Sequence, residues 1–115
     1  AIAGKRFATG TAVSSTTTSS IRQRDGSSKT LYTLTVSGLT FKPSLIVVNG
    51  TDSQSFTSFG VLIGKYFIGA NIGTSGGITT GWNSRTSASP LFVDETGFNV
   101  SVGEGELLYN WQAFE

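Results

Sequence analysis

The 115-residue chain contains no cysteine, no histidine and no methionine. The absence of cysteine excludes disulfide bonds and thiolate chemistry, and the absence of histidine removes the commonest general base of enzymes. Zinc sites built from these two residue types are excluded for the same reason. We therefore expect neither a metal site nor another cofactor.

Charged residues are scarce, at 13% of the chain against about 25% in typical domains. The formal net charge of +1 gives no general attraction to nucleic acids or acidic membranes. Arg22, Arg24 and Lys29 form the main basic cluster, which Asp25 interrupts, a pattern typical of a solvated loop. No apolar run approaches the roughly 20 residues that span a bilayer. We expect no nucleic-acid partner and no membrane insertion.

Aromatic residues, glycine and strand-length apolar runs take the place of the missing charges. The chain holds eight Phe, three Tyr, two Trp and 15 Gly, and its Thr-, Phe- and Val-rich composition favours sheet over helix. Residues 98–102 and 107–114 alternate with the two-residue period of half-buried strands. The dipeptide Asp25-Gly26 is a hairpin signal. Leu45-Ile46-Val47-Val48 has no polar alternation, which indicates a central strand covered on both faces.

These patterns predict one all-β domain over residues 1–115, a single antiparallel β-sandwich of about seven or eight strands. Asn71 to Pro90 is the longest stretch without a clear apolar period. We interpret it as a long Gly/Ser/Thr-rich loop region on the surface, with room for one short strand near Ile78–Trp82. Trp111 lies on the alternating face of the last strand, and we expect it in the core.

The candidate binding residues fall in this loop-like stretch and are Trp82, Asn83, Arg85 and Asn71. Aromatic faces stack on sugar rings, and amide and guanidinium groups form well-directed hydrogen bonds with hydroxyls. The alternative is that Trp82 packs beneath the loop as a satellite core residue, because large aromatic side chains are mostly buried. The sequence leaves both interpretations open.

Carboxylates are the remaining route to catalysis. A glycosidase needs two acids roughly 5 to 9 Å apart across a cleft. The pairs Asp94/Glu95 and Glu104/Glu106 both lie in Gly-flanked turns, where acidic residues belong for turn formation and solubility. We therefore expect a protein that is not an enzyme, with a carboxylate-based glycan hydrolase as the alternative.

The order of motifs resembles a known family from Gly4 to Glu115. The stretches that carry the resemblance are Gly4–Thr11, Leu34–Val48 with its Gly-Leu-x-Phe-x-Pro-Ser core, Thr96–Val100 and the closing Trp111–Glu115. Together they resemble the C-terminal domain of tail fibre and baseplate proteins of phages and prophages of Gram-positive bacteria. The closing Trp-x-Ala pattern is similar to that of H-type lectins, which are small trimeric β-sandwiches.

The resemblance implies a homotrimeric receptor-binding tip on an extracellular virion, attached to other tail proteins. Its expected ligand is a host cell-wall polysaccharide or a teichoic acid, and the resemblance transfers no individual site residue. Because the chain begins at Ala1 without Met, we expect a C-terminal fragment of a longer fibre protein. The alternative function is purely structural, in which the domain trimerises or caps a fibre, or decorates a virion, without a ligand.

Overall fold

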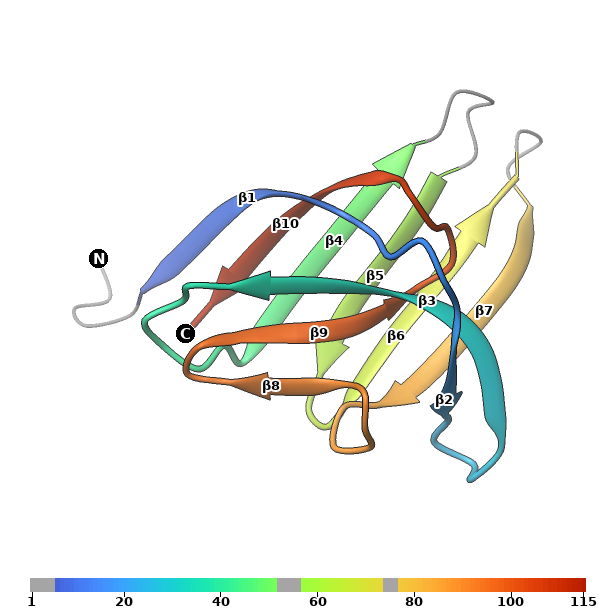
Figure 1. Ribbon diagram of the computed structural model, residues 1–115, viewed down its shortest axis with the longest axis horizontal. Coiled ribbons are helices and arrows are strands. Elements are labelled where there is room, and N and C mark those ends of the chain that lie inside the picture. The colour runs from blue at the N-terminus through green and yellow to red at the C-terminus, as the bar shows by residue number, and fades with distance from the viewer. Residues whose placement is uncertain (1–5, 52–56, 74–76) are drawn as a thin grey trace.

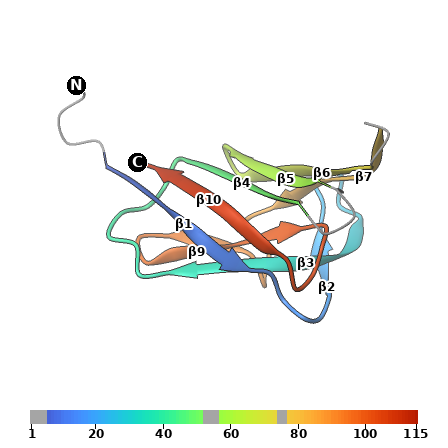
Figure 2. The ribbon, with the colours of Figure 1, turned by 90° about the horizontal axis from the view of Figure 1, so that it is seen from above.

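The computed structural model describes residues 6–51, 57–73 and 77–115. In these residues the chain forms ten strands in two antiparallel sheets and no helix, which confirms the predicted all-β sandwich. The described part of the chain accordingly has no helix that could cross a membrane. Figures 1 and 2 show the sheets as two facing layers.

The larger sheet has six strands, and the smaller has four. The order in the larger sheet is β1 (Phe7–Val13), β10 (Leu108–Phe114), β4 (Leu45–Thr51), β5 (Thr57–Ile63), β6 (Tyr66–Ile72) and β7 (Ile78–Arg85). The order in the smaller sheet is β2 (Ser19–Arg22), β3 (Ser28–Ser37), β9 (Gly97–Val102) and β8 (Phe92–Asp94). Because β1 pairs with β10, the first and last described residues lie together, and Arg6 forms an ion pair with Glu115 at 2.7 Å.

The core lies between the sheets, and its side chains come from the alternating positions of both. Phe98 and Trp111 meet edge to face with ring centroids 5.8 Å apart, a favourable geometry for aromatic pairs. Trp111 is 8% exposed, as the sequence predicts. The other buried members of this cluster are Leu34, Val36, Phe41, Ile46, Val48, Leu62, Phe67, Val100, Val102, Tyr109 and Ala113.

A second, smaller cluster lies near the hairpin of β2 and β3. Ile21, Leu31, Trp82 and Leu91 pack together there. The hairpin turns at Asp25-Gly26, where Gly26 has a φ of 91°, a left-handed conformation that glycine adopts at little steric cost. The turn predicted from these two residues is thus present, and it brings β2 and β3 beside the edge strand β7.

Two features differ from the sequence-based expectation. The stretch interpreted as a long loop with room for one short strand near Ile78–Trp82 contains the eight-residue strand β7. The described residues form ten strands in all, more than the seven or eight predicted. Strand β4 is central in its sheet, but only one of its faces is covered by this chain. Ile46 and Val48 are fully buried, whereas Leu45 is 39% exposed on the opposite face.

Candidate functional site

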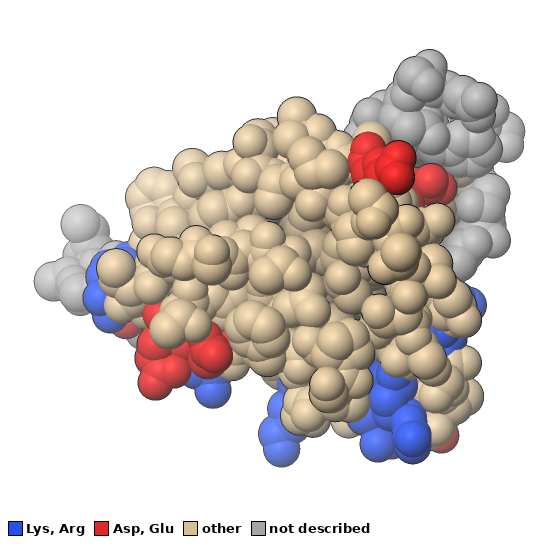
Figure 3. All heavy atoms as spheres, viewed as in Figure 1, with Lys and Arg blue, Asp and Glu red and all other residues tan. Residues whose placement is uncertain are grey.

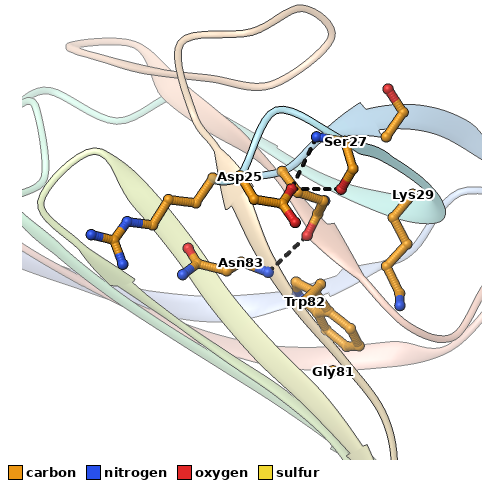
Figure 4. Close-up of a pocket in the computed structure, with 9 residues that line it drawn as sticks. Asp25, Ser27, Lys29, Gly81, Trp82 and Asn83 are labelled. Carbon is orange, nitrogen blue, oxygen red and sulfur yellow. Dashed lines mark hydrogen bonds between the residues drawn. The ribbon is translucent and has the colours of Figure 1, made fainter.

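A cleft of about 690 Å³ lies between the β2–β3 hairpin and strand β7. Figure 4 shows that its side chains come from these two segments, which are more than 50 positions apart in the sequence. Its lining residues are Gln23, Arg24, Asp25, Ser27, Ser28, Lys29, Gly81, Trp82 and Asn83. We call this hollow the hairpin cleft.

Gln23 joins the two walls of the hairpin cleft. Its Oε1 accepts a hydrogen bond from the backbone N–H of Asn83 at 2.8 Å, and its Nε2 donates to Oγ of Ser84 at 3.1 Å. The backbone N–H of Arg24 donates to the carbonyl of Asn83 at 2.8 Å. Because Gln23 is 8% exposed, these bonds are shielded from water and fix the hairpin against β7.

Asp25 supplies the negative charge of the cleft. Its Oδ1 accepts hydrogen bonds from the hydroxyl of Ser27 at 2.6 Å and from the Ser27 backbone N–H at 2.9 Å (Figure 4). These bonds, the hydroxyl first, lower the pKa of the Asp25 carboxyl below its ordinary value, so the group is ionised at neutral pH. Its other oxygen has no partner among the described residues and is free to accept a hydrogen bond from a ligand.

Trp82 and Lys29 face each other across the cleft, as Figure 4 shows. Trp82 is 5% exposed and belongs to the small core cluster, so it contributes to a wall of the cleft and offers no open stacking platform. Lys29 is half-buried and forms no ion pair within the described part of the chain. Two buried polar atoms, Nε1 of Trp82 and Oδ1 of Asn83, also lack hydrogen-bond partners.

Positive charge gathers at this end of the molecule. Arg22, Arg24, Lys29 and Arg85 line the hairpin cleft or the hollow of about 320 Å³ beside it, and Asp25 is the single acid there. The local formal charge is therefore +3, against +1 for the whole chain. Figure 3 shows a group of Lys and Arg side chains over the β2–β3 end, and further basic groups at the opposite end and along the lower edge.

The arginines of this group are held by neighbouring groups. The guanidinium of Arg24 lies 5.6 Å from the ring centroid of Tyr66, within cation–π range. Arg85 donates from Nη2 to the carbonyl of Arg24 at 2.9 Å. The hairpin end is thus braced against β6 and β7 while it stays positively charged.

The structure brings together only some of the residues predicted from the sequence. Trp82 and Asn83 line the hairpin cleft, and Arg85 borders the adjacent hollow. Asn71 is 7% exposed and its Nδ2 lies 3.4 Å from Oε1 of Glu104, away from the cleft lining. Asn71 faces inward because the alternation of β6 places it on the side of the core.

Sequence reasoning missed the contribution of the hairpin. Arg24, Asp25 and Lys29 were interpreted as a solvated loop, yet they form one wall of the cleft. The feature of the sequence that could have pointed to this wall of the cleft is the basic cluster next to the Asp25-Gly26 turn. That signal could not reveal that the hairpin lies against β7, because the contact joins segments far apart in the chain.

The described lining of the hairpin cleft does not contain the carboxylate pair that the alternative hydrolase needs. Asp25 is the only acid in the lining of the hairpin cleft, whereas a glycosidase requires two. Asp94 accepts hydrogen bonds from the hydroxyl and the N–H of Thr96 at 2.6 and 2.8 Å, which lower the pKa of its carboxyl and close its turn. Within the described ranges, no three acidic residues group together in a way that could hold a metal ion.

Comparison with known proteins adds no further assignment. No protein-family model matches the chain, and neither the curated proteins nor the solved structures provide a match.

Proposed function

We propose that this domain is a non-catalytic receptor-binding tip of a phage tail fibre, which recognises a glycan on the surface of the host cell. The observation that carries the proposal is the hairpin cleft, which combines an unpaired Lys29 ammonium, a free oxygen of Asp25 and the Trp82 wall. A concave surface with a few directed polar groups is typical of small-ligand sites. The resemblance of the sequence to tail fibre proteins supports the same function.

The chemistry of the cleft favours a hydroxyl-rich ligand that also carries negative charge. The free Asp25 oxygen accepts a hydrogen bond from a hydroxyl, while Lys29 and Arg24 attract a phosphate or a carboxylate. The local charge of +3 adds attraction from a distance, which weakens with salt. A teichoic acid, which is a polyol joined by phosphodiesters, or an acidic cell-wall polysaccharide fits these requirements.

The position of the cleft agrees with recognition at a fibre tip. The first and last described residues lie together at one end of the long axis, and the β2–β3 turn lies toward the other (Figure 1). A fibre shaft attached through the chain ends would leave the cleft facing away from the shaft. In a homotrimer, three weak sites would act together and raise the overall affinity through effective concentration.

Binding to isolated cell walls of Gram-positive bacteria tests the proposal. We expect the purified domain to sediment with walls, and Lys29→Ala to weaken binding roughly 10- to 150-fold, because a charged hydrogen bond contributes about 1.5–3 kcal/mol. The matched control is Lys42→Ala, which removes a lysine from a separate hollow and should bind as the wild type does. Equal losses in both variants would show general charge attraction and contradict a site in the hairpin cleft.

The second candidate function is a structural domain that trimerises or caps a fibre without a ligand. The apolar outer surface of the six-stranded sheet favours it, because exposed apolar residues gather there and large patches of this kind mark interaction surfaces. An oligomer that binds none of a panel of neutral and acidic cell-wall polymers would favour this candidate over the receptor-binding function.

A further inference from the structure

Large hydrophobic side chains are exposed mainly on one side of the molecule. Of nine such residues, only Phe92 belongs to the smaller sheet. The register places the others in rows, because directly paired residues of antiparallel strands point to the same face. Phe7, Phe114 and Leu45 form one row across β1, β10 and β4, while Val47, Val61 and Ile68 form another across β4, β5 and β6.

We call the surface that these rows form the outer face. Its most exposed members include Phe7, Val13, Ile63 and Leu108, at 57 to 68% exposure. Phe7 and Phe114 stack with ring centroids 6.2 Å apart. The remaining apolar members are Leu45, Val47, Phe59, Val61, Tyr66, Ile68 and Phe114.

The sequence pattern of the strands in the outer face is typical of strands that are covered on both sides. Residues 45–48, 61–63 and 66–68 are uninterrupted apolar runs, a pattern typical of strands buried on both faces. One half of each run fills the core, as Ile46, Leu62 and Phe67 show with 0 to 3% exposure. The other half lies on the outer face, which this chain alone leaves open to solvent.

The size of the outer face suits a stable interface. Six strands about 4.8 Å apart, each with seven residues rising about 3.3 Å, span on the order of 600 Å² in projection. Stable interfaces bury about 800 Å² per partner, so the projected area of the whole face, polar positions included, is of the same order.

The charge and polarity of the outer face restrict the kinds of partner that can bind to it. Arg85, at the β7 edge, is the one charged residue that the described strands place at an outward register position. The guanidinium of Arg24 lies over the ring of Tyr66, the residue paired with Arg85, so both cations lie at this edge. Since the described strands place no other charge on the face, a partner selected by charge is disfavoured. Thr9, Gln112, Thr11 and Asn110 form an uncharged polar stripe across β1 and β10, and burying such groups in lipid without hydrogen bonds is costly.

We propose that the outer face is covered by the outer faces of other copies of this chain in a closed homo-oligomer of two or three copies. A second copy offers the same uncharged apolar rows, and its polar stripe can satisfy the amides and hydroxyls that lipid would leave unpaired. This inference does not depend on a ligand in the hairpin cleft, which lies at the β2–β3 end and not among the apolar rows.

Light scattering of the purified chain at about 100 µM tests this assignment. We expect a mass of two or three times 12.1 kDa, with three times required by the trimeric fibre tip. Ile68→Glu should reduce the mass to that of one chain, because it buries a carboxylate in the middle of the outer face. Phe92→Glu is the matched control, because Phe92 has the same 39% exposure but lies on the other sheet. This substitution should leave the mass of the oligomer unchanged.

Leu108→Glu, at a site 57% exposed, provides a second outer-face variant if Ile68→Glu does not fold, and circular dichroism establishes folding for each variant. A single-chain mass for the wild type would overturn the proposal, as would a folded Ile68→Glu or Leu108→Glu protein that keeps the wild-type mass. Lys29→Ala should keep the oligomer whatever it does to wall binding, so the two proposals can fail separately.

Discussion

Gly60 and Phe67 meet in the core between β5 and β6, and their contact allows a quantitative prediction. A Cβ atom added at Gly60 would lie 2.6 Å from Cζ of Phe67 and still closer to Cε2. Phe67 is fully buried, so its ring has no free space to move into. We predict that Gly60→Ala lowers the free energy of unfolding by about 2–3 kcal/mol, the upper part of the range for overpacked cores.

The same geometry predicts that a second substitution relieves the clash. Phe67→Leu alone should lower the free energy of unfolding by about 1–2 kcal/mol through lost apolar burial. In the double variant, the new methyl group of residue 60 occupies space that the ring has vacated. We therefore expect a total loss of about 2 kcal/mol, well below the sum of the single losses, which is about 4 kcal/mol.

Urea unfolding followed by tryptophan fluorescence measures these differences, because both tryptophans are at most 8% exposed and will report the loss of packing. All variants should be compared at one protein concentration, since self-association adds to apparent stability. Gly81→Ala is the control, because the nearest atom to its added Cβ is 3.7 Å away. If the loss in the double variant equals the sum of the two single losses to within about 0.5 kcal/mol, the packing argument is refuted.

Two further predictions concern buried polar groups. Gln23→Ala should lower the free energy of unfolding by about 2–4 kcal/mol, because the Asn83 N–H and the Ser84 hydroxyl lose the hydrogen bonds that Gln23 forms with them. Urea unfolding measures this loss, and a loss below about 1 kcal/mol would contradict the prediction. Burial raises the pKa of Tyr109 above its ordinary value of 10.0, so its stabilising contribution is complete below about pH 10 and decreases as the pH rises further. Thermal unfolding between pH 9 and 11 should therefore show a smaller alkaline loss in Tyr109→Phe than in the wild type, and equal losses would contradict burial of the hydroxyl.

The fold class could be predicted from the sequence because most strands have a local residue pattern that is typical of a strand. The alternation of residues 98–102 and 107–114 corresponds to β9 and β10, and Asp25-Gly26 forms a hairpin turn. Strand β7 was predicted only in part, as a short strand near Ile78–Trp82, because its inward side includes Ser84 in place of an apolar residue. Ser84 is fully buried and accepts a hydrogen bond from Ser101 at 2.8 Å, and no two-residue apolar period results from such a polar pair.

The candidate site was only partly predictable for a different reason. Trp82 and Asn83 stood out because their side-chain chemistry suits a binding site. Lys29 and Asp25 gain their role only when the hairpin packs against β7, and no local pattern in the sequence records that contact. The outer face could be predicted in part. The apolar run at Leu45–Val48 correctly indicated that β4 is a central strand, but it did not reveal that the described residues leave the outer side of β4 exposed.

The pairing of β1 with β10 makes the order of the strands along the chain partly exchangeable. The Glu115 backbone N–H donates to the carbonyl of Arg6 at 2.8 Å, so a short peptide linker could join the two ends without moving either strand. New termini could then be opened in the exposed turn at Gly64-Lys65, between β5 and β6. Such a circular permutant would keep every strand neighbour of both sheets. It would also move the attachment point of any fused protein from strands β1 and β10 to the turn between β5 and β6, at the same end of the larger sheet.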